Sequence, residues 1–336
     1  MKKHFNIGII GATGAVGIEA IKLIEDRYPD YDINLRLFAS KRSANKVINT
    51  KFRNLQVEEL NHGNIFKELD YAIFSAGKTI SLEYAPQSVK NDCVVIDNTS
   101  AYRMDKNVPL VIPEINPETL KEHNGIIANP NCSTIILLMA IYPIHMISPI
   151  NKIIVSTYQA VSGAGMSAIE ELYNESKAYL NNESYNRKKF PHQVAFNVFS
   201  HETDINTDGY NMEEEKMINE CHKILKNDIE VIPTCIRVPI PRCHSESIYI
   251  ETENHINIDE IKQSLSNFDG VKIVDDPINN HYPMPSEASQ KYDVFVGRIR
   301  KVSSKKNAYS LFCCGDQLLK GAALNAVQIL DKFIHR

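Results

Sequence analysis

A short segment around one cysteine has the residue types for nucleophilic catalysis. The run Ala128-Asn-Pro-Asn-Cys-Ser-Thr134 stands directly before a long apolar run with the composition of a helix. Pro130 fixes the approach of the chain, and either Asn131 or Ser133 can cap the helix. Cys132 therefore falls at or beside a helix N-terminus, where the helix dipole favours the thiolate. A thiolate can attack an aldehyde carbon, and the backbone amides at this point can stabilise the resulting oxyanion.

The other cysteines have a simpler interpretation. Cys93, Cys313 and Cys314 lie inside apolar runs, and we expect them to be buried structural thiols. The chain has seven cysteines, an odd number, with no C-x-x-C pair and no group of cysteines and histidines at metal-ligand spacing. We therefore expect no metal site, and free thiols in a reducing cytoplasm.

A thiol nucleophile needs an acid/base partner. The segment 236–246 offers Arg237 and His244, which we expect at the end of a strand, separated by a proline-restricted bend. An arginine fork can hold a substrate carboxylate in a bidentate manner, and a histidine suits proton transfer at neutral pH. The chain has eleven histidines, however, so residue type alone does not single out His244.

A glycine-rich turn indicates a nucleotide cofactor. Gly11-Ala-Thr-Gly-Ala-Val-Gly17 follows an expected first strand and opens an expected helix, with the spacing G-x-x-G-x-x-G. Glycines let the backbone approach a pyrophosphate, and amides at the helix N-terminus face its oxygens. The alternative is a strand–turn–helix with no ligand. The predicted cofactor-binding residues of the turn are Gly11, Thr13, Gly14, Ala15 and Val16.

The end of the second expected strand indicates which nicotinamide is bound. Enzymes that use NAD place an acidic residue there for the ribose 2′-hydroxyl. This chain has Phe38-Ala-Ser-Lys-Arg-Ser43 instead, with no carboxylate. Arg42 and Ser43 suit a 2′-phosphate, so we predict NADP. The alternative is that Lys41 and Arg42 belong to a solvated loop.

The pattern of elements predicts two domains, as the length of 336 residues also favours. The first third alternates buried strands with helices, which is typical of a doubly wound dinucleotide fold. From about Asn151 longer strand-like runs follow one another, which predicts an α+β domain with a mixed or antiparallel sheet. The fold class is α/β: a Rossmann-like NADP-binding domain over 1–130, completed by the C-terminal helical segment 316–336, and a catalytic and dimerisation domain over 131–315.

The expected elements are best given as ranges. The strands are Phe5–Ile10, Asn34–Ala39, Tyr71–Ser75, Cys93–Asp97, Lys152–Tyr158, Val231–Val238, Ser247–Glu251, Asp293–Arg300 and Ala308–Cys314. The helices are Ala15–Arg27, Ala164–Leu180, Met212–Leu225 and Leu318–Phe333. We expect the polar segment Asn181–Lys189 to be a mobile loop.

Bulk properties exclude several classes of function. Hydrophobic residues make up 43% and charged residues 23% of the chain, as in soluble globular proteins. The net charge is −4 and basic residues are dispersed, so neither a nucleic-acid surface nor a membrane surface is indicated. The apolar run near the N-terminus is short and continues into the glycine turn, which favours a buried strand over a signal peptide.

Taken together, the motifs resemble those of the aspartate-β-semialdehyde dehydrogenase family. The segments GATGAVG, FASKRSA, DNTSAYRM, ANPNCST, YQAVSGAG, RVPIPRCHSE and DQLLKGAALNA occur in the family's order, from residue 11 to 326. The resemblance implies a phosphorylating, NADP-dependent aldehyde dehydrogenase that acts on aspartyl phosphate, aspartate semialdehyde and inorganic phosphate. It also implies a homodimer and a place in lysine, threonine and methionine biosynthesis.

The resemblance implies a role for each matched residue. Cys132 is the acyl-thioester nucleophile, His244 the general acid/base, and Gln159 helps to hold the substrate. Arg237 grips the α-carboxylate, and Glu213 is the partner of the α-amino group. The phosphate ligands are Arg103, Asn131 and Lys216, and the further cofactor contacts are Ser162, Gly163 and Gln317.

Two positions depart from the family pattern. The residue before the histidine is often glycine and is Cys243 here, and the turn RSAG ends in Asn45. Two other functions stay open on sequence grounds. One is N-acetyl-γ-glutamyl-phosphate reductase, which shares the catalytic logic. The other is a non-enzymatic sensor that binds NADP on the same fold.

Overall fold

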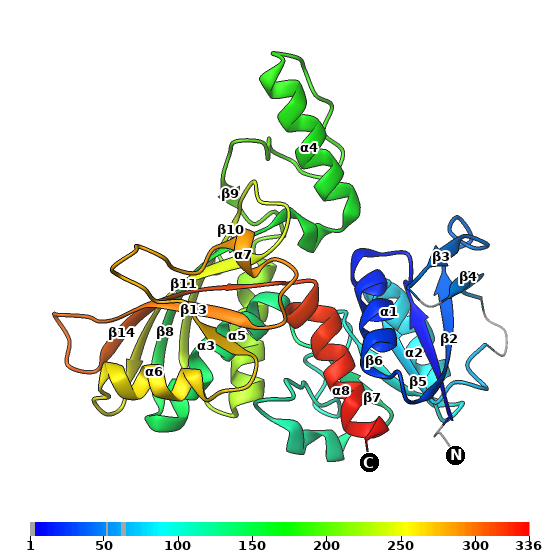
Figure 1. Cartoon of the computed structure of the whole chain (residues 1–336), viewed down its shortest axis with the longest axis horizontal. Helices are drawn as coiled ribbons and strands as arrows, with labels where there is room; N and C mark the ends of the chain where they lie inside the picture. Colours follow the sequence, from blue (N-terminus) through cyan, green and yellow to red (C-terminus); the bar gives the residue numbers. More distant parts are fainter. Residues whose placement is uncertain (1–3, 52, 62–64, 336) are drawn as a thin grey trace. The chain divides into compact units, whose positions relative to one another are not determined.

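The structure is a computed structural model that describes residues 4–51, 53–61 and 65–335. The chain divides into two compact units. The N-terminal unit comprises Met1–Asn131 together with Ala322–Arg336, and the C-terminal unit comprises Cys132–Gly321. Each unit contains its own seven-stranded sheet, so each is described by itself (Figure 1).

The sheet of the N-terminal unit is almost entirely parallel. Its strand order is β3-β4-β2-β1-β5-β6-β7, and only β3 runs antiparallel to its neighbour. Without β3, the six parallel strands follow the order 3-2-1-4-5-6 that defines the doubly wound dinucleotide fold. The strands are β1 (His4–Ile10), β2 (Asp32–Ala39), β3 (Val47–Asn49), β4 (Asn54–Glu59), β5 (Tyr71–Phe74), β6 (Val94–Asp97) and β7 (Ile126–Ala128).

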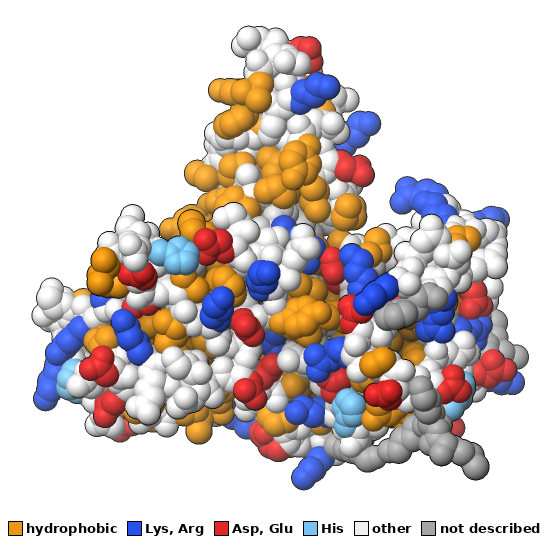
Figure 2. All heavy atoms as spheres, in the orientation of Figure 1, with side chains coloured by type: hydrophobic (Ala, Val, Ile, Leu, Met, Phe, Trp, Pro, Cys, Tyr) orange, Lys and Arg blue, Asp and Glu red, His pale blue; other side chains and the backbone are white. Residues whose placement is uncertain are grey.

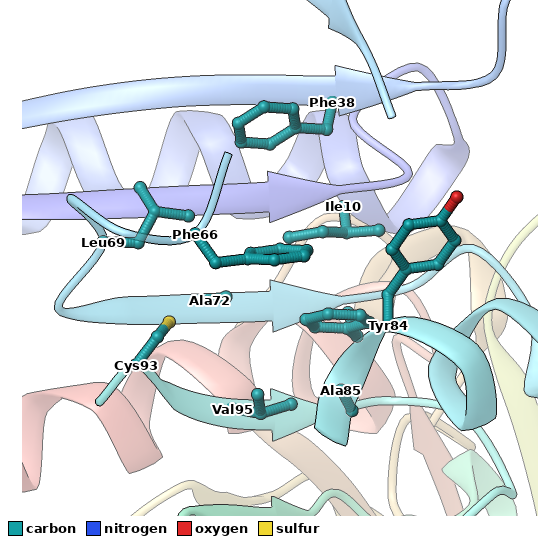
Figure 3. Close-up of a cluster of buried hydrophobic side chains, with 10 residues drawn as sticks. Ile10, Phe38, Phe66, Leu69, Ala72, Tyr84, Ala85, Cys93 and Val95 are labelled. Atoms are coloured by element: carbon teal, nitrogen blue, oxygen red, sulfur yellow. The ribbon is translucent and has the colours of Figure 1, made fainter. Parts of the chain in front are cut away.

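Three α-helices pack with this sheet: α1 (Ala15–Arg27), α2 (Lys78–Val89) and α8 (Leu324–Ile334). One buried cluster combines Tyr84 and Ala85 of α2 with residues of the central strands, among them Ile10 and Val95 (Figure 3). On another side of the unit, α8 packs on α1 and β6. Phe74 and Val95 are completely buried, as expected for strands covered on both faces.

The sheet of the C-terminal unit is mixed. Its order is β12-β13-β14-β11-β8-β10-β9, with parallel pairing of β8 with β10 and of β12 with β13. The other neighbouring strands are antiparallel. The strands are β8 (Ile150–Gln159), β9 (Phe199–Ser200), β10 (Glu230–Arg237), β11 (His244–Thr252), β12 (Val271–Ile273), β13 (Val294–Lys301) and β14 (Ala308–Gly315).

Helices α3 (Cys132–Ile147), α5 (Met212–Leu225) and α6 (Ile258–Ser266) cover one face of this sheet. Side chains alternate accordingly: Ile153 and Val155 of β8 are buried against the helices, whereas Ile154 between them is 40% exposed on the opposite face. A short helix α7 (Pro285–Ala288) packs beside β14.

Helix α4 (Met166–Leu180) projects from the sheet of its own unit (Figure 1). Figure 2 shows apolar side chains gathered over this projection. Tyr173 of α4 is exposed, and the exposed rings of Tyr179 and Phe196 contact each other. Two buried glutamates tie the following loop to α4. Glu171 accepts hydrogen bonds from the backbone N–H groups of residues 188–190, and Glu175 accepts them from residues 194 and 195.

The predicted fold class is confirmed, and most predicted elements agree with the structure to within a few residues. Three local expectations need correction. His244 begins β11 rather than ending a strand. The segment Leu318–Phe333 is not one uniform helix, because Leu319–Ala323 forms a π-helical turn before α8. The loop Asn181–Lys189 was expected to be mobile, yet its end is fixed by Glu171, a partner that polar composition alone does not indicate.

Candidate active site

Cys132 is the first residue of α3 and differs from every other cysteine of the chain. It is the only one of the seven that is not buried. Burial raises the pKa of the thiols of Cys93 and Cys314 to about 12, and it raises the pKa of the remaining four as well. Those six thiols are therefore protonated at neutral pH. The position of Cys132 at a helix N-terminus leaves it as the one cysteine suited to thiolate chemistry.

Strand ends converge beside the first turn of α3. Gln159 ends β8 and is paired in register with Arg237, which ends the parallel strand β10. His244 begins the antiparallel strand β11, opposite Gly315 at the end of β14. The Gln159 amide donates to the Ser133 hydroxyl at 2.8 Å, which ties this edge of the sheet to the residue after Cys132. Sheet register and one buried hydrogen bond thus bring together residues more than 100 positions apart.

His244 is buried and has a defined tautomer. Its Nδ1 accepts a hydrogen bond of 3.0 Å from the Ala160 N–H, so the proton of the neutral ring is on Nε2. Burial is the main reason that the pKa of His244 falls to about 3, and the charge of Arg237 lowers it further while Glu213 opposes the shift. Nε2 has no hydrogen-bond partner within the described chain. The ring therefore presents an unused N–H donor at neutral pH.

The Arg237 guanidinium is held from several sides. It donates to the Ala160 carbonyl at 2.8 Å and to His201 Nε2 at 2.8 Å. It also forms a bidentate ion pair with Glu202, through Nε at 3.2 Å and Nη2 at 2.8 Å, and its face lies over the Phe190 ring. The guanidinium is thus rigidly placed at the end of β10.

The first turn of α5 presents the other charged pair. Asn211 caps this helix by accepting from the N–H groups of Glu213 and Glu214, and Glu214 completes the capping box. Lys216 lies one turn after Glu213 and donates to its carboxylate at 2.8 Å. The Gln159 amide lies 3.4 Å from the other Glu213 oxygen. The predicted residues Gln159, Glu213, Lys216, Arg237 and His244 therefore share one edge of the C-terminal unit.

The predicted cofactor contacts of this unit lie at the same edge. A Cβ on Gly163 would lie 3.4 Å from the His244 ring, so glycine leaves the imidazole open. The side chains of Ser162 and Gln317 are hydrogen-bonded to each other, and Gln317 Oε1 accepts from the Cys243 N–H at 2.8 Å. Cys243 has φ +85°, a left-handed conformation that favours glycine. The departure from glycine at this position is therefore a strained one.

The N-terminal unit has its own candidate binding site, which is formed by backbone and small polar groups rather than by charged side chains. Gly11 has φ +92°, and a Cβ there would lie 2.8 Å from the Ser75 backbone; a Cβ on Gly17 would lie 2.4 Å from the Gly11 oxygen. Helix α1 begins after Gly14 without a side-chain cap. At the ends of β5 and β6, Ser75 Oγ and both amide atoms of Asn98 are buried without a partner in the described chain. Open amides and unpaired polar atoms at the sheet's switch point fit a dinucleotide.

The remaining predicted residues also belong to the N-terminal unit. Arg42 is exposed and Ser43 buried in the turn after β2, where Asn45 has φ +63°. Arg103 is buried, and its guanidinium donates to the carbonyls of residues 98 and 129 at 2.9 Å each. Asn131 is buried directly before Cys132. These residues belong to the N-terminal unit, whereas the His244 edge belongs to the C-terminal unit.

Sequence reasoning missed several residues that complete the site. Glu202 and His201 bond Arg237 from 35 and 36 positions away, and Phe190 covers its face. No local pattern marks them, because a two-residue strand, β9, places them beside β10. Asp97 could have been found from the sequence, because it is a carboxylate at the end of an expected strand. It accepts hydrogen bonds from Ser81 and Thr99, which shape the turn that leads to Arg103.

Within the described residues, no helix is both long enough and apolar enough to cross a membrane. Two family models match the chain, and together they cover most of it. The model for the semialdehyde dehydrogenase NAD binding domain matches residues 6–123, and the model for the semialdehyde dehydrogenase dimerisation domain matches residues 141–320. The class is thus a two-domain, nicotinamide-dependent dehydrogenase.

Individual relatives narrow this class. Aspartate-semialdehyde dehydrogenases from Bacillus subtilis and Aquifex aeolicus are 46% and 47% identical to the chain, with 98% of each sequence covered. The crystal structure of aspartate semialdehyde dehydrogenase II from Vibrio cholerae, complexed with ASA, superposes with a TM-score of 0.95 at 37% identity, with 99% of both chains covered. The chain belongs to the semialdehyde dehydrogenase family and, within it, to the aspartate-semialdehyde dehydrogenases.

Proposed function

We propose that the chain catalyses the NADP-dependent reductive dephosphorylation of L-4-aspartyl phosphate to L-aspartate 4-semialdehyde, through a thioester on Cys132. The family assignment supports the reaction. The observation that carries the mechanism is the difference between Cys132 and the other six cysteines. Only Cys132 escapes burial, and it stands at a helix N-terminus tied to the edge that holds His244.

The proposed ligands suit a substrate that is charged at both ends. Arg237 binds the α-carboxylate and Glu213 the α-amino group, while Gln159 helps to orient the substrate between them. The proposed phosphate ligands are Lys216, Arg103 and Asn131. Arg237 and Lys216 each already have a carboxylate partner, so substrate binding exchanges one set of ionic contacts for another.

The chain's own groups perform the covalent chemistry. The Cys132 thiolate attacks the acyl carbon, the carbon–oxygen bond to phosphate breaks, and inorganic phosphate leaves. A bound nicotinamide supplies the hydride for reduction at this carbon. The negative charge on the substrate oxygen is stabilised by the backbone amides of the α3 N-terminus and by a hydrogen bond from the Nε2–H of His244, the residue to which the family resemblance assigns the acid/base role. The carbonyl double bond then re-forms as the carbon–sulfur bond breaks, which releases the aldehyde and restores the Cys132 thiolate.

The cofactor is held by the glycine turn and by the end of β2. Thr13, Ala15 and Val16 bind the pyrophosphate through their backbone amides, while Gly11 and Gly14, whose N–H groups donate to the Phe38 and Gly11 carbonyls, let the backbone come close to it. Ser162, Gly163 and Gln317 are further proposed contacts. Arg42 and Ser43 bind the 2′-phosphate. The lack of a carboxylate in the turn after β2 supports NADP over NAD.

We also propose that the active form is a cytoplasmic homodimer. The dimerisation-domain model covers 141–320, and the face of the C-terminal sheet opposite to its helices carries half-buried Tyr158, Tyr249 and Phe312 beside the exposed Ile154. A second copy would bury this face. The buried thiols suit a reducing compartment.

The test is the oxidation of L-aspartate 4-semialdehyde, followed as NADPH formation with and without phosphate. We expect turnover that depends on phosphate and on Cys132, with NADP binding retained in Cys132→Ala. Activity on N-acetyl-glutamate semialdehyde alone would replace the substrate assignment. NADPH formation that survives Cys132→Ala would contradict the mechanism.

A further inference from the structure

The Glu202 carboxylate occupies one side of the arginine that is proposed to hold the substrate carboxylate. The two Glu202 oxygens accept from Nε and Nη2 of Arg237 at 3.2 and 2.8 Å. The Arg237 side chain is 3% exposed and that of Glu202 is 18% exposed. This is a partly buried, bidentate ion pair inside the site, not a surface contact.

A count of donors shows what the pair leaves for a ligand. A guanidinium has five N–H groups. Within the described chain, Glu202 takes one from Nε and one from Nη2, His201 takes the other from Nη2, and the Ala160 carbonyl takes one from Nη1. The remaining N–H is on Nη1. A ligand can therefore gain one hydrogen bond from Arg237 without displacing Glu202.

The nitrogen that carries this N–H lies next to His244. A Cβ built on Gly163 would lie 4.0 Å from Arg237 Nη1 and 3.5 Å from His244 Nε2, so both nitrogens border the space above this glycine. His244 Nε2 is buried and lacks a partner in the described chain. A substrate carboxylate on the Nη1 side of Arg237 would thus lie beside His244.

The two cations at this edge each have a carboxylate partner without a ligand. Arg237 is matched by Glu202, and Lys216 is matched by Glu213 at 2.8 Å. Burial alone would raise the pKa of Glu202, but the hydrogen bond and positive charge of Arg237 outweigh burial and lower it. Glu202 is therefore ionised at neutral pH, and a second carboxylate at Arg237 meets a guanidinium whose charge is already neutralised.

We propose that Glu202 is a specificity-determining residue, which restricts the site to substrates with a cationic amino group beside the carboxylate. A zwitterionic α-amino acid brings its own cation, which the carboxylates of Glu202 and Glu213 attract. An aldehyde with the carboxylate but no amino group adds an unbalanced negative charge. The inference rests on the proposed function, because it takes Arg237 as the carboxylate ligand.

Positioning of Arg237 is a different role for Glu202, and the two roles predict different results. The Ala160 carbonyl, His201 and the Phe190 ring also hold the guanidinium. Glu202→Gln removes the negative charge, keeps one acceptor oxygen for Arg237 and replaces the other with an amide NH₂. If charge is what matters, the variant changes the choice between substrates; if positioning matters, it weakens every substrate alike.

The experiment compares wild type with Glu202→Gln on L-aspartate 4-semialdehyde and on its des-amino analogue, succinate semialdehyde. Glu215→Gln is the control, because Glu215 is a part-buried carboxylate of α5 that accepts from Asn206, not from Arg237. We expect Glu202→Gln to raise kcat/KM for the des-amino aldehyde at least tenfold relative to the amino aldehyde, mainly through KM. The control should stay within twofold of wild type.

A binding measurement separates this inference from the proposed function. The dissociation constants of L-homoserine and 4-hydroxybutanoate, which differ by the amino group, need no turnover. We expect the same shift in preference in Glu202→Gln. An unchanged preference, or an equal loss for both ligands, overturns the role of Glu202. If the preference shifts while wild type fails to oxidise aspartate semialdehyde, the proposed reaction is wrong and the charge selection at Arg237 stands.

Discussion

Two candidate binding regions of the molecule are built from different groups. The turn between β1 and α1 is formed by backbone atoms, whereas the edge that holds His244 is formed by side chains. At the turn, Gly11 and Gly17 leave no room for a Cβ, and α1 begins without a side-chain cap. At the other edge, Arg237, Glu213 and His244 are buried and each is bonded to another residue. The first edge depends on space around the backbone, and the second depends on balanced charge.

The difference has a physical cause. Backbone amides are neutral dipoles, so a turn can leave them open toward a ligand at little cost. A buried charged side chain is strongly destabilising unless it is paired. The charged site therefore exists before substrate binds as a set of internal ion pairs. Catalytic residues there are held in place by partners that the substrate must accommodate.

Loss of the His244 hydrogen-bond donor should have the largest effect. His244→Asn removes the Nε2–H that stabilises the oxyanion, and removal of one such donor lowers kcat about 10²- to 10³-fold. We expect kcat to fall within that range while the semialdehyde KM changes little. His222→Asn, on the last turns of α5, is the control, since its Nε2 is hydrogen-bonded to the Ile229 carbonyl. A kcat within threefold of wild type for His244→Asn would contradict the role of this ring.

A larger side chain in the glycine turn between β1 and α1 should destabilise the fold. A Cβ at Gly17 would lie 2.4 Å from the Gly11 oxygen and 2.8 Å from Ala12 Cα, and backbone atoms cannot move aside. We expect Gly17→Ala to lower the free energy of unfolding of the N-terminal unit by about 3 kcal/mol. Gly14→Ala is the matched control, because its nearest contact would be at 3.3 Å and its φ is −81°. Equal urea midpoints for the two variants would refute this packing account.

Lowering the pH should lower the free energy of unfolding, because His244 is buried in its neutral form. The pKa of His244 is about 3 in the folded chain, against 6.5 for a solvated imidazole. Between these two pH values the unfolded chain binds a proton at this ring that the folded chain does not. The contribution of the neutral ring to the free energy of unfolding is therefore complete above pH 6.5 and is lost as the pH falls toward 3. Compared with His244→Asn, wild type should lose up to about 1.4 kcal/mol per pH unit below pH 6. Parallel stability curves between pH 6 and 4.5 would show that the ring is not buried in its neutral form.

The smallest effect concerns the choice of cofactor. Arg42 is exposed after β2, so its side chain can reach a 2′-phosphate. We expect Arg42→Ala to weaken NADP binding about tenfold, or about 1.4 kcal/mol, and to leave NAD binding unchanged. Lys46→Ala, another exposed cation past the same turn, should alter neither. An equal loss for both cofactors would place Arg42 elsewhere on the dinucleotide.

Sequence was sufficient for the features that are local. The glycine turn and the start of a helix at or beside Cys132 each follow from a few consecutive residues. It was also sufficient for the fold class, because strands buried on both faces have a different composition from those of a mixed sheet. The family motifs then supplied the set of site residues, which local physics did not.

Sequence was insufficient where long-range pairing decides. Glu202 and His201 bond Arg237 only because β9 pairs with β10, and no periodicity marks a two-residue strand. The tautomer of His244 depends on the Ala160 N–H, 84 positions away. The loop after α4 was expected to be mobile because its composition is polar, but the decisive groups are the buried carboxylates of Glu171 and Glu175 on the helix before it.

The most direct test of the account is to trap the acyl-enzyme. Wild type is mixed with L-aspartate 4-semialdehyde and NADP⁺ in the absence of phosphate, quenched in acid, digested, and analysed by mass spectrometry. We predict one aspartyl thioester, on the peptide that contains Cys132, which disappears when phosphate is added before the quench. An acyl group on any of the six buried cysteines, or phosphate-dependent turnover without acylation of Cys132, would contradict the central claim.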